Sequence, residues 1–519
     1  MPAPTPKDAP DPRRWWTLAV LSLSLLVIGI DNTILNVALP TLERDLGASS
    51  SQLQWIVDAY LLVFAGLLLT AGTLGDRFGR KRALSFGLFV FGLGSGLAAL
   101  AETPETLIAT RALMGIGGAF IMPSTLSIIT VVFHGAERAK AIGIWAAMAG
   151  LGIAIGPVAG GWLIENASWS WIFLVNVPVV IVALAAGRGL IPESKDPAAQ
   201  PLDVPGFGLS IVGLTALVWA IIEAGSSSWT EPAVLAGFGV AAVSLALFMR
   251  RELHTPHPML DVRLFRNPRF SGASAAITLT FFALFGSIFF LTQYLQGVLG
   301  YTALEAGIRV TPIAAGLILG GPLSAKLAAR FGTNRVVAAG LVLVATGLLV
   351  VTQLDAGSSY GLIAAHLVVL GFGMGMTMAP ATESVMGSLP LAKASVGSAV
   401  NDTTRLTGGT LGVAVLGSLL SSRYRGDMDG AVSQLPQAAG DAAQDSLSAA
   451  LTIAGRAGSP QLAEAAQQAF VSGMHLAAAA AAGVALVGAV IALVVIPAFE
   501  PEAVDEESSP VRERELVPA

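Results

Sequence analysis

Six ionisable side chains lie inside stretches of sequence that are otherwise apolar. They are Asp31, Asp58, Arg111, Glu383, Asp402 and Arg405. A charged group inserted into the hydrocarbon layer of a membrane costs about 3 kcal/mol or more, so such residues are functional candidates by default. A buried carboxyl group near a cation can gain or lose a proton when its surroundings change. These residue types therefore indicate the binding and release of protons or of cations.

Several of these residues also have a purely structural interpretation. Asp402 and Arg405 are three positions apart and share one face of a helix, so they can form an internal ion pair. Arg111 can pair with a nearby carboxylate, and Asp31 or Asp58 can be a buried structural group. The sequence leaves both interpretations open.

The composition of the chain places these charges in a membrane. Of the 519 residues, 54% are hydrophobic and 12% are charged, about half of the charged share of a soluble domain. The 58 glycines and 28 prolines suit membrane helices, in which both are more frequent than in soluble ones. The chain has no cysteine, which excludes disulfides and thiolate metal sites. We predict an all-α polytopic membrane protein.

A helix of about 20 apolar residues crosses the hydrocarbon layer, and the sequence predicts fourteen such spans. Their ranges are 15–39, 52–72, 83–101, 105–131, 138–161, 170–190, 205–224, 232–250, 270–296, 303–325, 335–354, 360–387, 398–420 and 473–497. With the N-terminus in the cytoplasm, the inner segments hold most of the 29 Lys and Arg residues, as the positive-inside rule requires. Both termini are therefore predicted to be cytoplasmic.

A short internal repeat divides the chain into two related halves. RFGRKR (77–82) follows the second span, and RFGTNR (330–335) follows the tenth. Duplicated bundles are typical of transporters. The predicted organisation is a cytoplasmic tail (1–14), a six-helix bundle (15–190), two additional helices with linkers (191–269), a second six-helix bundle (270–497) and a cytoplasmic tail (498–519).

Five motifs carry a resemblance to a known family. GTLGDRFGRKR (72–82) matches the G-x-L-x-D-R-x-G-R-K/R signature of the major facilitator superfamily. Four more stretches match its fourteen-helix drug:proton antiporter branch, the multidrug-resistance exporters: DNTILNVALPTLERDL (31–46), RALMGIGGAFIMP (111–123), GPVAGGWL (156–163) and WSWIFLVNVP (169–178). The resemblance extends over almost the whole chain. It implies the major facilitator fold, with two six-helix bundles and two extra middle helices.

The resemblance implies a conformational latch in the loop after the second span. Its residues are Gly72, Gly75, Asp76, Arg77, Gly79, Arg80 and Lys81. Asp76 would cap the N-terminus of a neighbouring helix, where the helix dipole favours an anion, and Arg80 would tie it to another helix. The second copy has Thr333 and Asn334 in place of Arg80 and Lys81, so its latch should be weaker.

Further roles follow from the resemblance in the fifth span and at the buried charges. The antiporter motif of the fifth span comprises Gly152, Gly156, Pro157, Gly160 and Gly161. It implies a bendable interface between the halves, and the same residues predict close helix packing of the small-xxx-small type. Arg111 would influence proton uptake and release. Asp31 would be the acid for which a proton and a cationic drug compete, with Asp58 as a second candidate.

A possible cavity wall is formed by aromatic and thioether side chains on the ninth and twelfth spans. These are Phe281, Phe285, Phe289, Tyr294, Met374 and Met378. Such side chains accommodate varied lipophilic cations, although each can equally face lipid or a neighbouring helix.

The long outer segment 421–472 has two open interpretations. Its parts 441–455 and 459–470 have the pattern of amphipathic helices, and Ser459 and Pro460 suit an N-cap and a first helical position. The segment is either a surface helical pair or flexible linker, or a lid over the outer mouth of a transport path.

The expected function is proton-coupled efflux of lipophilic, cationic drugs or dyes across the bacterial inner membrane by alternating access. An exporter dedicated to one endogenous metabolite or antibiotic is the alternative, and a peptide-type proton symporter is a more remote one. The sequence contains no catalytic cluster, metal site or Walker motif, so we expect no enzyme activity, no metal and no ATP or other cofactor. The expected partners are small molecules, protons and the bilayer, with no nucleic acid, and we expect a monomer.

Overall fold

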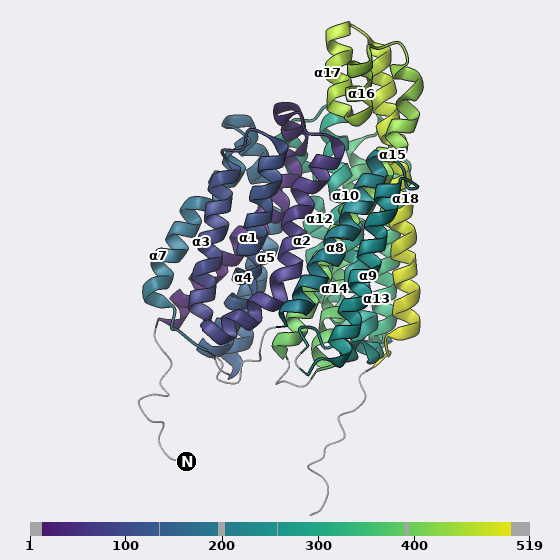
Figure 1. Ribbon diagram of the computed structural model, residues 1–519. Coiled ribbons are helices and arrows are strands. Elements are labelled where there is room, and N and C mark those ends of the chain that lie inside the picture. The colour runs from purple at the N-terminus through teal and green to yellow at the C-terminus, as the bar shows by residue number, and fades with distance from the viewer. Residues whose placement is uncertain (1–12, 134, 196–202, 257, 390–393, 500–519) are drawn as a thin grey trace, which may run out of the picture.

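The computed structural model describes residues 13–133, 135–195, 203–256, 258–389 and 394–499, and in this part of the chain it contains helices and no strand. The first half comprises α1 (Arg14–Leu46), α2 (Ser50–Phe78), α3 (Arg80–Ala98), α4 (Pro104–Val132), α5 (Gly135–Asn166), α6 (Trp171–Leu174) and α7 (Asn176–Leu190). The helices run side by side along one direction (Figure 1). The all-α prediction is confirmed.

Two additional helices and a second half follow. The additional helices are α8 (Val204–Ser226) and α9 (Pro232–His254), followed by the short η1 (Val262–Arg266). The second half comprises α10 (Pro268–Gln293), η2 (Tyr294–Val298), α11 (Ala303–Arg309), α12 (Pro312–Phe331), α13 (Thr333–Val351), α14 (Tyr360–Gly387), α15 (Ala394–Val432), α16 (Gln437–Asp445), α17 (Leu447–Ala457) and α18 (Pro460–Val495).

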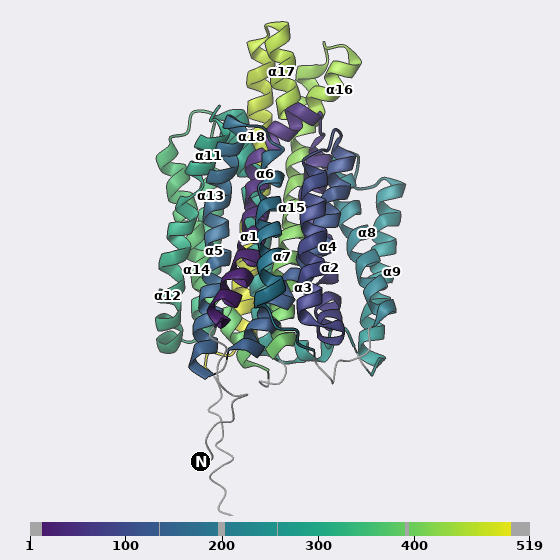
Figure 2. The same ribbon diagram turned by 90° about the vertical axis from the view of Figure 1, so that its left-hand side faces the viewer.

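Within the described residues, 11 helices are long and apolar enough to cross a membrane. The long helices α3, α5 and α15 lie among them in the bundle (Figures 1 and 2). Fourteen spans are consistent with this arrangement, and the number stays a prediction.

The two halves repeat one pattern of helix packing. In the first half α1 packs on α5, α2 on α4, and α3 on α4; in the second half α10 packs on α15, α12 on α14, and α13 on α14. A glycine with positive φ joins the second and third helices of each half, Gly79 (φ 123°) and Gly332 (φ 90°). In each half, the backbone N–H of the residue after this glycine donates a hydrogen bond to the segment that follows the last helix of the half. The Arg80 N–H donates to Ser194 O (2.9 Å), and the Thr333 N–H donates to Ala498 O (2.7 Å). The predicted repeat is thus visible in the backbone.

Helix α8 lies over the junction between the halves, which we call the seam. It packs on α2 of the first half and on α15 of the second. Ser418 of α15 donates a hydrogen bond to Ile221 O of α8 (2.7 Å). On the α2 side, Ile211 fills the space beside Gly66.

Helices α16 and α17 stand at one end of the bundle (Figure 2), which we call the outer end in accord with the predicted topology. The structure corrects the predicted boundaries here. Segment 441–455 is divided at Ser446 between α16 and α17, and 459–470 is the first part of α18 instead of a separate helix. Ser459 and Pro460 are the N-cap and first residue of α18, as predicted, but the Ser459 side chain makes no capping hydrogen bond.

Cysteine labelling tests the predicted topology. In this cysteine-free chain, an exposed Ser433→Cys should react with an impermeant maleimide in intact cells, because Ser433 lies at the outer end. Lys195→Cys should react only after the cells are opened. Labelling of residue 195 but not residue 433 in intact cells would overturn the topology.

Candidate functional site

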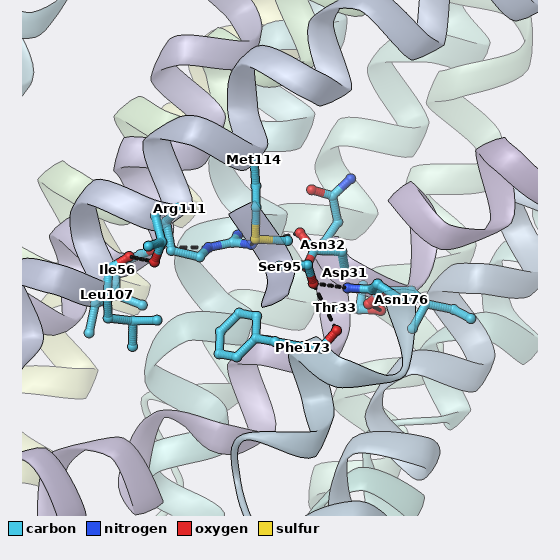
Figure 3. Close-up of polar contacts among 12 residues, drawn as sticks. Asp31, Asn32, Thr33, Ile56, Ser95, Leu107, Arg111, Met114, Phe173 and Asn176 are labelled. Carbon is cyan, nitrogen blue, oxygen red and sulfur yellow. Dashed lines mark hydrogen bonds and ion pairs between the residues drawn. The ribbon is translucent and has the colours of Figure 1, made fainter. Parts of the chain in front are cut away.

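An ion pair between Asp31 and Arg111 joins α1 to α4 in the core of the first half (Figure 3). Arg111 Nη1 lies 2.7 Å from Asp31 Oδ2, and the two side chains are 2% and 0% exposed. Arg111 Nε donates to Ile56 O of α2 at 3.2 Å, and its guanidinium lies 4.3 Å above the ring of Tyr60. One arginine therefore links three helices.

Polar groups from α3 and α7 complete the surroundings of the pair. The Ser95 hydroxyl donates to Phe173 O (2.8 Å) and accepts from Asn176 Nδ2 (3.1 Å), and Asn176 lies next to Asp31 (Figure 3). Among the described residues, Asp31 Oδ1 and the Tyr60 hydroxyl have no hydrogen-bond partner of normal geometry. Buried polar atoms are nearly always partnered, so these two atoms leave hydrogen-bonding capacity unused beside the ion pair.

Asp58 lies on the face of α2 that meets the second half. It is 0% exposed, and neither carboxylate oxygen has a hydrogen-bond partner in the described part of the chain. Residues four positions apart share a helix face, and both such neighbours face α15. Gln54 lies 3.4 Å from the Ser418 hydroxyl, and Leu62 packs in one cluster with Ala414. Asp58 is therefore a buried carboxyl at the seam.

Asp402 and Arg405 form an ion pair on α15. Arg405 Nη1 lies 3.8 Å from Asp402 Oδ1, and Arg405 also donates to the Thr382 hydroxyl (3.2 Å). Its guanidinium lies 5.6 Å from the ring of Phe281. The ion pair that the sequence allows is therefore present, whereas Glu383, next to Thr382, is exposed and lies outside it.

The predicted cavity wall is divided by the structure. Phe281 and Phe285 form a tilted pair with ring centroids 5.9 Å apart. Phe289, although it belongs to α10, packs into the core of the first half, so these three rings approach the seam. Tyr294 is instead fully buried and donates to Asp355 O (2.5 Å).

The two methionines lie in the interior of the second half. Met374 packs into its main core cluster, and Met378 packs against a smaller one. Tyr294 and Met374 therefore do not face an open wall in this conformation.

A small cavity of about 30 Å³ lies at the seam itself, with walls from both halves. Its polar lining comes from Thr33 and Asn36 of α1, Thr292 of α10, and Thr311 at the start of α12. Sequence reasoning missed these residues. Thr33 and Asn36 lie within one or two helical turns of Asp31, and Thr292 lies on the aromatic face of α10, which are signals that could have found these three. Thr311 had no such signal.

The glycines of the antiporter motif let α5 approach α1 closely. A Cβ atom on Gly152 would lie 2.8 Å from Gly29, and one on Gly160 would lie 2.6 Å from Ile34 Cγ1. A Cβ on Gly161 would lie 2.5 Å from Ala303 O of α11, in the other half. The predicted close packing is confirmed, and it extends across the seam.

The loop after α2 forms a local network that differs from the predicted latch. Arg80 Nε lies 2.7 Å from Asp76 Oδ1, one helical turn away. The acid at the start of α3 is instead Glu193, which accepts from the Lys81 backbone N–H (3.1 Å), while Lys81 Nζ donates to Arg188 O (2.8 Å). The described residues show no hydrogen bond from the start of a neighbouring helix to Asp76, so its predicted capping role stays a prediction. Sequence reasoning missed Glu193. An acidic residue just after the sixth span, on an inner surface that is otherwise basic, was a signal that could have identified it.

The family model described as Major Facilitator Superfamily matches residues 21–413. The chain belongs to the major facilitator superfamily. It is 39% identical over 492 residues to the multidrug efflux pump LfrA of Mycolicibacterium smegmatis, covering 94% of this chain and 97% of that protein. It is 34% identical to the tetracenomycin C resistance and export protein of Streptomyces glaucescens, covering 97% and 96%, and 35% identical to the methyl viologen resistance protein SmvA of Salmonella typhimurium, covering 79% and 83%.

A solved structure supports the major facilitator fold. A bacterial homologue of the human lysosomal transporter Spinster, in an inward-facing and unoccupied conformation, superimposes with a TM-score of 0.66 at 20% identity, covering 93% of this chain and 98% of that one. With this fold and these relatives, the chain is a multi-pass membrane protein of a transporter family.

In this major facilitator protein, hydrogen bonds join the two halves at the outer end. Gln296 Nε2 donates to Val37 O (2.9 Å), and the Leu304 N–H donates to Glu165 Oε1 (2.8 Å). Gln54 and Ser418 make a third link. The structure therefore shows the outer end closed.

Proposed function

We propose that this protein exports lipophilic, cationic drugs or dyes across the bacterial plasma membrane in exchange for protons, by alternating access. Its relatives are multidrug and antibiotic resistance exporters, which supports drug efflux. The observation that carries proton coupling is the fully buried Asp31–Arg111 pair, since ionisable groups within a membrane domain mark proton relays. Both termini are proposed to lie in the cytoplasm.

Through this ion pair, protonation of Asp31 can cause a helix to move. A proton on Asp31 removes the charge that holds Arg111, which weakens the link between α1 and α4. Because α1 packs on the glycines of α5, and α5 meets α11 across the seam, a shift of α1 reaches the interface between the halves. One charge moving inward gains about 2.3 kcal/mol per 100 mV, which can drive export.

The structure favours a different acid for direct contact with the substrate. Arg111 and the core of the first half enclose Asp31, so a cationic drug cannot reach it in this conformation. Asp58 is buried as fully as Asp31, but it lies on the face of α2 that meets α15 and would be uncovered when the halves separate, and among the described residues it has no hydrogen-bond partner. Asp402 lies near Phe281 through its partner Arg405. We propose Asp58 and Asp402 as cation contacts, with Glu383 as a further candidate, and Phe281, Phe285 and Phe289 as the aromatic wall.

Export of one antibiotic or metabolite is the second candidate function. The match to the tetracenomycin C resistance and export protein, which covers 97% of this chain and 96% of that protein, supports it. The two candidates differ only in substrate range, which a panel of compounds separates.

Transport into everted membrane vesicles tests the proposal. Vesicles that contain the protein should accumulate fluorescent lipophilic cations when a proton gradient is imposed, and an uncoupler should abolish the accumulation. Transport of a single compound in a broad panel would favour the dedicated exporter. Accumulation that is unaffected by the uncoupler would contradict proton coupling.

Asp76→Asn should slow export several-fold and leave substrate binding nearly unchanged. The Asp76–Arg80 pair lies in the inner loop, remote from the seam cavity, so its loss should alter the balance between conformations and not the contacts with substrate. Transport rates and equilibrium binding to purified protein measure the two effects separately. Asp427→Asn, which removes a similar pair with Arg423 one turn away, is the matched control. An equal loss of binding and transport would show that Asp76 acts otherwise.

A further inference from the structure

The outer helices form a cap that belongs to the second half. We define the outer cap as residues 421–470, comprising the outer end of α15, α16, α17 and the start of α18. The Tyr424 hydroxyl donates to Ala443 O (2.9 Å), and Leu447 and Ala450 of α17 pack with Leu462 of α18 in the core cluster of the second half. This apolar packing makes the cap move with that half.

In the described part of the chain, hydrogen bonds join the cap to the ends of α1 and α2 in the first half. One oxygen of Glu43, in the last turn of α1, accepts hydrogen bonds from the Ser446 hydroxyl and from the Ser448 N–H (3.4 Å). The Ser50 hydroxyl, at the start of α2, donates to Asp445 O (2.5 Å). Polar contacts of this kind can break and re-form without exposing an apolar surface.

Glu43 occupies a site shaped for a carboxylate. Glu43 is only 8% exposed. Its carboxylate lies at the first turn of α17, where free N–H groups and the helix dipole favour an anion. Ser446 is the N-cap of that helix and accepts from the Ala449 N–H (3.0 Å). The same hydroxyl therefore starts α17 and binds Glu43.

A cavity of about 680 Å³, partly open to solvent, lies between the cap and the outer ends of both halves. Its walls come from both halves and from the cap: Thr41 and Glu43 of α1, Glu165 of α5, Gln296 of η2, and Leu451 of α17. Pockets for small molecules have volumes of about 300–1,000 Å³. A molecule released at the outer end would enter this space.

We propose that the outer cap is a gate on the exit path, held against the first half by Glu43. The carboxylate belongs to the first half and the cap belongs to the second, so separating the halves at the outer end requires Glu43 to leave Ser446 and Ser448. The cap then moves away from the first half and widens the opening of the cavity. This inference rests on the proposed export by alternating access.

Reversible cross-linking in the cysteine-free chain tests the gate. A short, reducible bis-thiosulfonate reagent would join Glu43→Cys to Ser446→Cys. Cross-linked protein should lose at least nine-tenths of its export, and reduction should restore it. The control pair is Arg423→Cys with Ser472→Cys, whose native side chains are 3.0 Å apart but both lie in the second half, and its cross-link should leave export unchanged. Full export by the 43–446 cross-linked protein would overturn the proposal.

A second measurement does not depend on transport. Thr41 is a buried residue in the wall of this cavity, close to Glu43. An impermeant maleimide should label Thr41→Cys about tenfold faster when Glu43→Gln is added, the factor expected for losing one hydrogen bond to a charged acceptor. Glu464→Gln, an exposed position on α18, is the matched control and should have no effect. An unchanged labelling rate in the Glu43→Gln protein would overturn the gate. If the parent protein exports nothing, the proposed function fails, while labelling still decides whether Glu43 holds the cap.

Discussion

Arg111→Met is expected to abolish export and to lower the free energy of unfolding by about 3 kcal/mol or more. Removing one partner of a buried ion pair leaves the other charge unpaired in a dry core, which destabilises proteins by about 3–5 kcal/mol. Here the residual charge would be that of Asp31, which is 0% exposed. Thermal unfolding of the purified protein and export from vesicles measure the two effects.

The double variant Asp31→Asn with Arg111→Met separates stability from coupling. It removes both charges, so the free energy of unfolding should return to within about 1 kcal/mol of the parent protein, since apolar or neutral replacement of a whole buried pair is often tolerated. Export driven by the proton gradient should remain absent, because no titratable group is left at this position. Normal proton-driven export by the double variant would place the coupling acid elsewhere, with Asp402 as the next candidate.

Gly156→Val is expected to reduce export more than tenfold and to lower the free energy of unfolding by about 1–3 kcal/mol, the usual range for overpacking a close contact. A Cβ at this position would meet the Thr33 hydroxyl and lie 3.0 Å from Ile30 O, so α5 would be forced away from α1. The same two helices line the seam cavity, and export should therefore fail even in protein that still folds.

Gly143→Ala provides the matched control on the same helix. A Cβ on Gly143 would have no atom within 4 Å, so this change should alter neither export nor stability appreciably. Loss of export in Gly143→Ala as well would indicate that α5 needs glycine for its flexibility and not for its contact with α1.

The sequence predicted the helices well because each depends on a local property. Runs of about 20 apolar residues are visible in any window, and the repeated RFG motif fixed the relation between the halves. The positive φ of Gly79 and Gly332 follows from that same motif. The boundary between α16 and α17 was predicted wrongly, although a serine N-cap such as Ser446 is a local signal. The contact of Ser446 with Glu43, 403 positions away, has no local signal.

The partners of the site residues could not be predicted for the same reason. Asp31 and Arg111 were both identified as candidates, but the sequence does not show that they meet across 80 positions. Asp76 was assigned to a neighbouring helix because the resemblance gives the role without the conformation, and Glu193 takes the place at the start of α3. Pairing is a property of the packed bundle, which no single window of sequence contains.

On one side of the seam, helix α8 lies between the junction of the halves and the surrounding lipid. It covers the line along which α2 meets α15, with Ile221 against Ser418 on one helix and Ile211 against Gly66 on the other. A hydrophobic compound dissolved in the bilayer therefore encounters a sealed flank when it diffuses toward α2 and α15. Under the proposed export function, a compound that enters from the leaflet would therefore have to approach along a flank that α8 does not cover, so the inserted helices would set a direction of approach within the plane of the membrane.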